Sequence, residues 1–460
     1  MKHSIEYWFL EAPVSRAILH MALPMMLGMA AMSIYNFTDL LFIGALGDTA
    51  ALAAIPLAMP VMAIFIGLST FLEIGVGTFI SRKLGAQERA AARGGSSFAV
   101  FAALGLGLLA GIALIAFIDP VLAILGANAE IYEVLKGYLI VYCCGAPFVV
   151  LAMVGAQLLR SITLSKQASA GLVLSAVVNI ALDPIFIFVF GMGLQGAAIA
   201  TIIANIATCV YFLLIISGNE ALSLNPLDCC ALRKKDLADI GKVGSSAFIM
   251  LIMMGGAALI FNNVAVSYGT AVVAGFGIAQ TIVQLLEVIT MGLYEGVVPL
   301  IAGAWGAKRL DRVKNIVRMT AFYLVGFCAL LCTILIMNSS MVAGWFSADE
   351  TVITIGAVII CAQALALVFD SGSGLITGIF QACSKGIASN AMAIARGVML
   401  PICIVAGSVL FGLDGAIWSL LAASLFTFAL GMIFVAITFR KSGKDLVADD
   451  SLTDGIQAEA

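Results

Sequence analysis

Acidic side chains occur in this 460-residue chain where nearly every neighbouring residue is apolar. In "VVNIALDPIFIFVFGMG" (177–193), Asp183 follows Asn179 by about one helical turn. Asp39 lies in a similar stretch, four residues after Tyr35. Because residues four apart share one face of a helix, each of these two carboxyl groups has a polar neighbour on its own face. These acids are therefore the first candidates for chemistry.

Six acids lie inside stretches that are expected to cross a membrane: Asp39, Glu73, Asp183, Glu287, Glu295 and Asp370. A charged side chain at mid-membrane costs about 2.5–3.5 kcal/mol on insertion scales, so such a group is by default a functional candidate. Poor hydration and a neighbouring carboxyl group both favour the protonated acid, which suits uptake and release of H⁺. Carboxylate, amide, hydroxyl and backbone oxygens together also suit Na⁺. The residues alone leave both chemistries open.

Depth within the apolar stretches groups some of these polar residues. Asp39 and Asp183 lie a few residues from the ends of their stretches that are expected to face outward, and Thr201 lies at a similar depth in the next stretch. At 1.5 Å per residue this is about 8–17 Å below the outer surface. With Asn179 and Tyr35, two carboxyl groups, an amide, a hydroxyl and a phenol can meet at one level.

Other roles are also considered for these acids. Asp183 can also be a structural hydrogen-bonding residue beside Pro184, and Glu73 and Glu295 lie near span ends, where a side chain can reach water. Glu287 and Asp370 lie deeper, and together with Gln280 and Tyr35 they are the candidates for lining a substrate cavity.

The composition tells which elements must position these residues. The chain is 62% hydrophobic and 11% charged, with a mean hydropathy of +1.13, whereas soluble domains carry about 25% charged residues. Apolar runs of about 20 residues recur, and in lipid they must form helices. The first run is too long for a cleaved signal peptide. Twelve spans are expected: 17–45, 52–79, 95–119, 135–158, 168–190, 194–217, 245–266, 271–302, 319–338, 352–381, 388–411 and 415–439.

The basic residues predict the orientation. Of the 23 Lys and Arg residues, only Lys136 falls on one side of this arrangement, and the others, including Arg160 and Arg396, are assigned to loops or ends on the opposite side. Such an asymmetry marks the basic side as cytoplasmic and places both termini there. The basic residues are thus topology signals, and no nucleic-acid partner is expected. No Cys spacing typical of a metal site and no G-x-x-x-x-G-K-[ST] motif is present, so we expect no cofactor and no direct use of ATP.

The chain contains two similar halves. Three pairs of segments recur about 220 residues apart: Gly47 with Gly269, "GVGTFISRKLGA" (75–86) with "GVVPLIAGAWGA" (296–307), and "GLQGAAIAT" (193–201) with "GLDGAIWSL" (412–420). Each half holds an even number of spans, so the repeats are parallel. The predicted organisation is a six-helix lobe over 1–217, a loop over 218–244, a second six-helix lobe over 245–440 and a polar, disordered tail over 441–460.

Three segments carry a resemblance to a known family. "ALPMMLGMAAMSIYNFTDLLFIGALGDTAALAA" (22–54), "LGAQERAAA" (84–92) and "FQACSKG" (380–386) resemble the multidrug and toxic compound extrusion (MATE) family. The resemblance covers nearly the whole chain in order. It implies an all-α polytopic transporter of a prokaryotic plasma (inner) membrane that is not an enzyme and exports amphipathic, often cationic drugs. We expect a monomer. Inward movement of H⁺ or Na⁺ would drive export as the two lobes rock in the membrane lipids.

The resemblance also implies an ion site. The DinF-like branch of the family uses positions that match Asp39, Asn179, Asp183, Thr201 and the carbonyl of Ala197, and the four side chains among them would be the ligands if the ion is Na⁺. The NorM-like branch places acids on spans 7 and 10. Here Asp370 fits the acid of span 10, but 245–266 contains no carboxylate and Met254 stands near the missing position. This departure favours the N-terminal lobe as the coupling site.

Three other functions are weighed against export. A flippase for a lipid-linked precursor would need a cationic cavity, and basic residues are expected to avoid the spans. An integral-membrane transferase would need catalytic groups in sizeable loops, and the chain has only His3 and His20. A channel needs no buried titratable switch, and saturation of flux would distinguish it from a transporter.

Overall fold

The computed structural model describes residues 4–457, and the side chains of residues 4–439. Within this range the chain forms helices and no strands, which confirms the all-α prediction. The membrane-crossing helices are α1 (Val14–Ala45), α2 (Thr49–Gly85), α3 (Arg89–Ala116), α5 (Ala129–Ser161), α6 (Ser165–Pro184) with η2 (Ile185–Val189), α7 (Gly193–Ser217), α8 (Lys234–Ser267), α9 (Thr270–Gly306), α10 (Leu310–Met337), α12 (Glu350–Ala382) and α13 (Gly386–Gln457). The short helices are η1 (Tyr7–Glu11), α4 (Ile118–Ile124), η3 (Pro226–Ala231) and α11 (Ser339–Gly344).

A single residue makes α13 into two spans. Gly412 has φ 63° and ψ −142°, outside the helical range, so the helix direction changes there. Only glycine adopts such a conformation without a steric cost. The two parts correspond to the expected spans 388–411 and 415–439, which brings the crossings to twelve. The side chains of 440–460 lie outside those described, so the disorder expected for 441–460 stays a prediction.

The connection between the two halves is shorter than the expected loop over 218–244. Helix α8 begins at Lys234, and the Asp236 carboxylate accepts a hydrogen bond of 3.0 Å from the backbone N–H of Arg233 at its start. An acid in the first turn satisfies a free amide and interacts favourably with the helix dipole. The first turns of α8 are charged and extend beyond the apolar run, which is why hydropathy alone placed the helix start too late.

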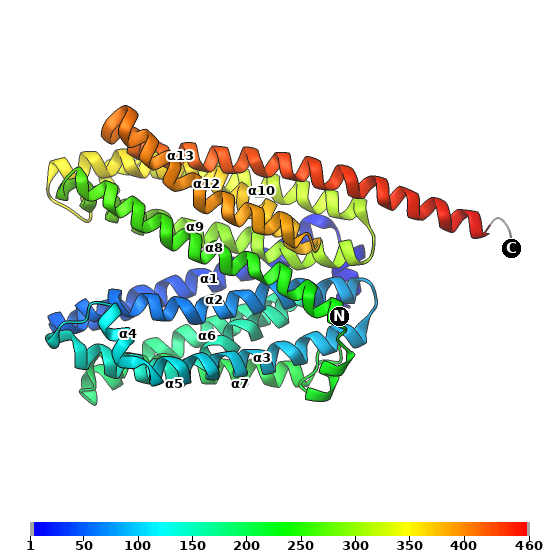
Figure 1. Cartoon of the computed structure of the whole chain (residues 1–460), viewed down its shortest axis with the longest axis horizontal. Helices are drawn as coiled ribbons and strands as arrows, with labels where there is room; N and C mark the ends of the chain where they lie inside the picture. Colours follow the sequence, from blue (N-terminus) through cyan, green and yellow to red (C-terminus); the bar gives the residue numbers. More distant parts are fainter. Residues whose placement is uncertain (1–3, 458–460) are drawn as a thin grey trace.

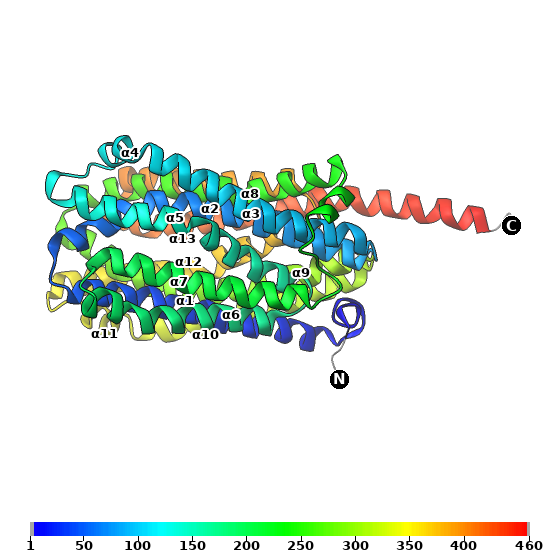
Figure 2. The same cartoon turned by 90° about the horizontal axis from the view of Figure 1, so that it is seen from below.

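The helices form two bundles that lie side by side. Figure 1 shows α1–α7 in the lower bundle and α8–α13 in the upper one. Across the boundary α1 packs on α9, and α2 packs on α8 and α9. We call the end that carries the connections 86–88, 218–233 and 307–309 the basic end. It is at the right of Figure 1, and the short helices α4 and α11 lie at the opposite end, as Figure 2 also shows.

The bundles touch most closely where α2 and α9 cross near the basic end. A Cβ atom added at Gly85 would lie 2.0 Å from the carbonyl oxygen of Gly303, and one added at Gly306 would lie 2.0 Å from that of Arg82. Gly85 and Gly306 hold equivalent positions in the two repeats, and so do Arg82 and Gly303. The crossing is therefore symmetric, as expected for two parallel repeats. Toward the other end the helices of the two bundles diverge (Figure 1).

A buried arginine joins the bundles beside this crossing. The Arg82 guanidinium forms an ion pair of 2.6 Å with Asp239 of α8 and donates hydrogen bonds of 3.0 and 3.2 Å to the carbonyls of Gln381 and Ala382 of α12. Arg82 as a whole is only 8% exposed. A charge-assisted bond with several acceptors is stronger than a bond between neutral groups. Arg82 therefore stabilises the contact between the two bundles near the basic end.

The one basic residue assigned to the far side is also paired. Lys136 and Tyr132 of α5 donate hydrogen bonds of 2.7 and 2.6 Å to Asp119 of α4. The hydrogen bond from Lys136 has the larger effect on Asp119, and the one from Tyr132 follows. Both favour the carboxylate and so hold the pKa of Asp119 below its usual value. Lys136 thus acts locally, which explains why it departs from the charge asymmetry of the other loops.

Packing inside one lobe gives a stability prediction. A Cβ atom at Gly111 of α3 would lie 2.4 Å from the carbonyl oxygen of Cys143 of α5, in the same lobe. We expect Gly111→Ala to destabilise the lobe by about 1–3 kcal/mol through overpacking. Thermal unfolding of purified protein in detergent measures this as a lower Tm. Gly105→Ala is the control in the same helix, because nothing lies within 4 Å of that position. Equal Tm values for the two variants would contradict the prediction.

Candidate functional site

The structure brings the N-lobe polar residues together between α1, α6 and α7. Asn179 of α6 donates hydrogen bonds from Nδ2 to Oδ1 of Asp183 at 3.2 Å and to Oγ1 of Thr201 of α7 at 3.3 Å. Asn179 is 1% exposed and Asp183 is fully buried. Ala197 is also buried, one turn before Thr201 on α7. The amide thus bridges a carboxyl group and a hydroxyl on adjacent helices.

The backbone after Asp183 departs from α-helical geometry. Pro184 has no amide N–H to donate within the helix, and the chain continues as the π-turn η2. π-turns inside helices frequently occur at functional sites. Pro184 therefore sets the point at which α6 passes into the π-turn. This point fixes the level at which Asp183 faces the neighbouring helices.

Asp39 and Tyr35 complete the cluster from α1. The carboxyl groups of Asp39 and Asp183 are close enough for their charges to interact, and Tyr35 lies near both Asp39 and Thr201. Neither acid has an ion pair with any side chain that the structure describes. The cluster would therefore carry up to two uncompensated negative charges.

Three acceptor oxygens in this cluster have no hydrogen-bond donor among the described residues. They are Oδ1 of Asp39, Oδ1 of Asn179 and Oδ2 of Asp183, and all three are buried. Buried polar atoms are nearly always satisfied, so an unsatisfied group calls for an explanation such as an ion. Two carboxylates, an amide oxygen and a hydroxyl are hard ligands that a proton or a small cation would satisfy. Among the described residues no set of three His, Cys, Asp or Glu side chains could hold a metal ion, so a Na⁺ site here would need Asn179 and Thr201 as ligands.

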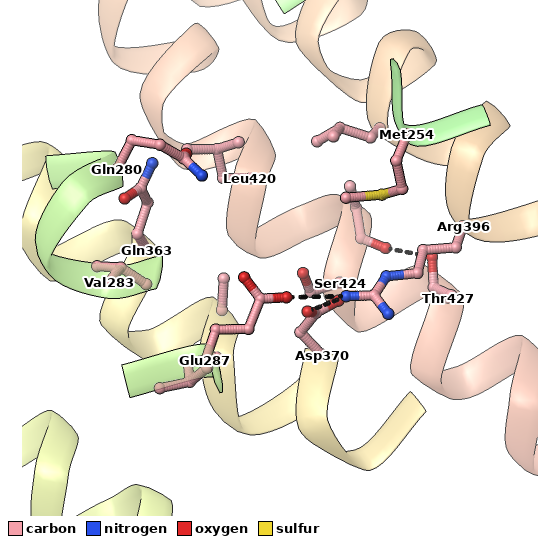
Figure 3. A pocket seen from close by; sticks show the side chains of 14 residues that line it. Met254, Gln280, Val283, Glu287, Gln363, Asp370, Arg396, Leu420, Ser424 and Thr427 are labelled. Atoms are coloured by element: carbon pink, nitrogen blue, oxygen red, sulfur yellow. Dashed lines mark hydrogen bonds and ion pairs between the residues drawn. The ribbon is translucent and has the colours of Figure 1, made fainter. Parts of the chain in front are cut away.

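The second lobe contains a separate pocket. Gln280 and Glu287 of α9 and Asp370 of α12 line a cavity of about 150 Å³, together with residues of α8 and α13 (Figure 3). Tyr35, the fourth residue expected in a substrate cavity, lies instead at the N-lobe cluster. The four candidates thus divide between two sites, one in each lobe.

Two arginines that were expected in loops lie in helices. Arg396, expected in a loop, lies in α13 and forms ion pairs with Glu287 at 3.4 Å and with Asp370. Arg160 lies in the last turn of α5, is 5% exposed, and forms an ion pair of 2.8 Å with Glu73. Arg396 therefore contradicts the expectation that basic residues avoid the spans, whereas Arg160 lies just beyond the expected span 135–158, at the basic end.

One signal for this pairing was present in the sequence. Residue 396 falls inside the expected span 388–411, and a cation there needs an anionic partner. Glu73 meets Arg160 instead of reaching for water, which corrects the expectation of a side chain at the membrane surface. Glu295 of α9 is close enough to this pair for their charges to interact. Glu73, Glu287 and Asp370 thus differ from Asp39 and Asp183, which have no basic partner among the described side chains.

Comparisons with known proteins agree with this architecture. The family model MatE matches residues 24–185 and 246–405, one segment in each half. The chain is 35% identical over 438 residues to the multidrug export protein MepA of Staphylococcus aureus strain N315, covering 95% of this chain and 96% of that protein. It is 34% identical over 436 residues to the MepA of Staphylococcus saprophyticus, with the same coverage.

Solved structures show the same fold. The MATE transporter VcmN of Vibrio cholerae in its bent form superposes with a TM-score of 0.88 at 21% identity, covering 93% of this chain and 97% of that one. A multidrug resistance MATE family transporter in an outward-facing conformation gives a TM-score of 0.88 at 24% identity, with 95% and 100% covered. At these identities the likeness concerns the arrangement of the helices.

Proposed function

This chain belongs to the MatE family of membrane transporters, and we propose that it exports amphipathic cations in exchange for H⁺ or Na⁺ bound between Asp39 and Asp183. The observation that carries the proposal is the set of three unsatisfied, buried acceptor oxygens on Asp39, Asn179 and Asp183. A proton or Na⁺ entering there would remove negative charge from a poorly hydrated place. The free energy of that binding would differ between states that hydrate the cluster differently.

The arrangement of the bundles supports an alternating cycle. The basic end, which we infer to be cytoplasmic from its Lys and Arg residues, is closed by the α2–α9 crossing and by Arg82. The other end is where the bundles diverge, and the N-lobe cluster lies in that half. We therefore infer an outward-open state in which an external ion reaches Asp39 and Asp183, after which the lobes rock and the ion leaves to the cytoplasm.

The same observations lead to a proposal for the location and assembly of the protein. The chain is a multi-pass membrane protein, and we propose the bacterial plasma membrane with both termini in the cytoplasm. Small-molecule drugs and the surrounding lipids are its partners, and the monomer contains every residue of the proposed ion site.

A flippase for a lipid-linked precursor is less well supported. That function needs surplus positive charge for a phosphate group. Arg160 and Arg396 do lie inside the helices, but Arg160 pairs with Glu73, and Arg396 pairs with both Glu287 and Asp370. Neither arginine has a free charge to offer an anionic headgroup.

Vesicle transport tests the proposal and distinguishes the two ions. Purified protein is reconstituted into liposomes with ethidium, and an inward Na⁺ gradient and a pH gradient are imposed separately at zero membrane potential. We expect one gradient to drive movement of ethidium against its own gradient, at least about tenfold faster than in protein-free liposomes. The ion that drives it identifies the coupling chemistry. Equilibration at the same rate with no gradient, with Na⁺ and with H⁺ would contradict antiport.

A further inference from the structure

The pocket of the C-terminal lobe carries an inference that rests on the proposed export of cations. We propose that Glu287 and Gln363 form a subsite for one cationic headgroup, such as an alkylammonium, and that Arg396 limits this subsite to a single positive charge by neutralising Asp370. Arg396 is then a specificity-determining residue. The pocket lies in the other lobe from the proposed ion site, so substrate and coupling ion have separate binding groups.

The charges of the pocket are unequally paired. Arg396 contacts Asp370 closely and Glu287 at the longer distance of 3.4 Å. The Asp370 side chain is 21% exposed and that of Glu287 is 38% exposed. Figure 3 shows both carboxyl groups turned toward the guanidinium, with one Glu287 oxygen directed away from it. With both acids ionised the three groups carry a net charge of −1, and most of it remains with Glu287.

A second acceptor points to a ligand independently of these charges. Gln363 of α12 lines the same cavity and is only 8% exposed, yet its Oε1 has no hydrogen-bond donor among the described residues. A buried amide oxygen without a donor is unfavourable, and an ammonium N–H would satisfy it. Glu287 and Gln363 thus contribute one charged and one neutral acceptor to the same cavity.

The size and lining of the pocket fit a headgroup better than a whole drug. Its volume of about 150 Å³ is well below the roughly 300–1,000 Å³ of pockets that enclose drug-sized ligands. Met254, Leu367 and Leu400 contribute apolar wall beside the charged groups. Methionine adapts to irregular apolar guests. The pocket would therefore take the ammonium group, and the apolar body of the ligand would stay outside it.

The test compares ligands that share a tail and differ by one charge. Octylamine carries one ammonium and N-octyl-1,3-diaminopropane carries two. Their dissociation constants are measured by calorimetry on the purified full-length protein without any ion gradient. In Arg396→Met the net charge of the pocket falls to −2. We expect the affinity for the diamine relative to the monoamine to rise about tenfold. This ratio corresponds to about 1.4 kcal/mol from a second charge-assisted contact. An unchanged ratio would overturn the proposal.

Further variants separate specificity from folding. Arg396→Met/Asp370→Asn removes a cation and an anion together and restores −1, so its ratio should return to that of the unchanged protein. This variant also serves if Arg396→Met does not fold, because removing both partners of a buried pair is tolerated better than removing one. Loss of monoamine binding in it would overturn the proposal. Glu287→Gln should weaken both ligands at least about tenfold, and full affinity there is equally contrary.

Two controls complete the design. Arg89→Met removes a cation whose side chain is 69% exposed and which lies outside the pocket, and it should leave the ratio unchanged. The readout is equilibrium binding, so it is independent of coupled transport. A shifted ratio in a protein that fails the vesicle assay would refute the proposed function alone, and coupled transport without a shifted ratio would refute the subsite alone.

Discussion

Export of cationic drugs by Asp183→Asn is expected to fall to the background rate, while the protein still folds and inserts. Asparagine keeps the shape of the side chain and the contact with Asn179, which spans 3.2 Å in the structure. It removes the negative charge and one of the two acceptor oxygens. Loss of a buried charged ligand costs about 2–5 kcal/mol, or at least about 30-fold in cation affinity. A coupling site weakened this far would no longer drive the cycle.

The stability of the same variant should move in the opposite direction. Asp183 is fully buried and has no basic partner among the described side chains, and burying an unpaired carboxylate opposes folding. We therefore expect the Tm of Asp183→Asn to equal or exceed that of the unchanged protein. A purely structural Asp183 predicts the reverse, with a lower Tm and partly retained export.

Measurement and control for this prediction are direct. Resistance of cells to ethidium and efflux from liposomes are measured with expression matched by immunoblot. Asp39→Asn should behave like Asp183→Asn because both acids belong to the proposed cation site. Asp119→Asn changes an exposed acid whose partner is Lys136 and should leave export unchanged. Normal efflux in either Asp39→Asn or Asp183→Asn would exclude that residue from the coupling site.

The N-lobe cluster could be predicted from the sequence for physical reasons. Helical geometry fixes that residues 179 and 183 share a face, and the length of each apolar run fixes their depth. The hydrogen bonds from Asn179 to Asp183 and Thr201 connect residues that were expected at one level. The coupling role of the cluster remains a proposal, because the positions of the side chains do not identify the ion.

The pairing of the other acids could not be predicted in the same way. Arg396 reaches Glu287 and Asp370 on two different helices, and spacing along one helix carries no information about which neighbouring helices face it. A count of basic residues treats Arg160 and Arg396 as orientation signals, although both are largely buried. The early start of α8 was missed for a related reason, since its first turns are polar and lie beyond the apolar run. Contacts between different helices were thus the part of the structure that the sequence did not predict.

Gly306→Ala is the second variant with a large expected effect, and it should stop export by preventing closure of the basic end. Its Cβ would lie 2.0 Å from the carbonyl oxygen of Arg82, a backbone atom of the other lobe. A steric clash inside a lobe, as at Gly111, lowers the stability of that lobe because its helices cannot move apart. A clash between lobes can be relieved when the lobes separate, so the conformational equilibrium should shift while each lobe stays folded.

The expected size of this shift follows from the cost of overpacking. A penalty of about 1–3 kcal/mol on the closed basic end lowers its population relative to the other state by about five- to 150-fold. Gly85→Ala should act alike, since Gly85 meets the carbonyl of Gly303 in the equivalent contact. Spin labels at positions 89 and 387, one in each lobe near the basic end, should report a longer mean distance by pulsed electron resonance in both variants.

The control for this prediction lies in the same helix. Gly277 of α9 has no atom within 4 Å of its added Cβ, so Gly277→Ala should keep both export and the distance between the labels. Gly306→Ala should keep its Tm within a few degrees of the control, because the clash lies between lobes that can move apart. A large drop in Tm with an unchanged label distance would show that α2 and α9 belong to one rigid core. Closure of the basic end would then not be a step in transport.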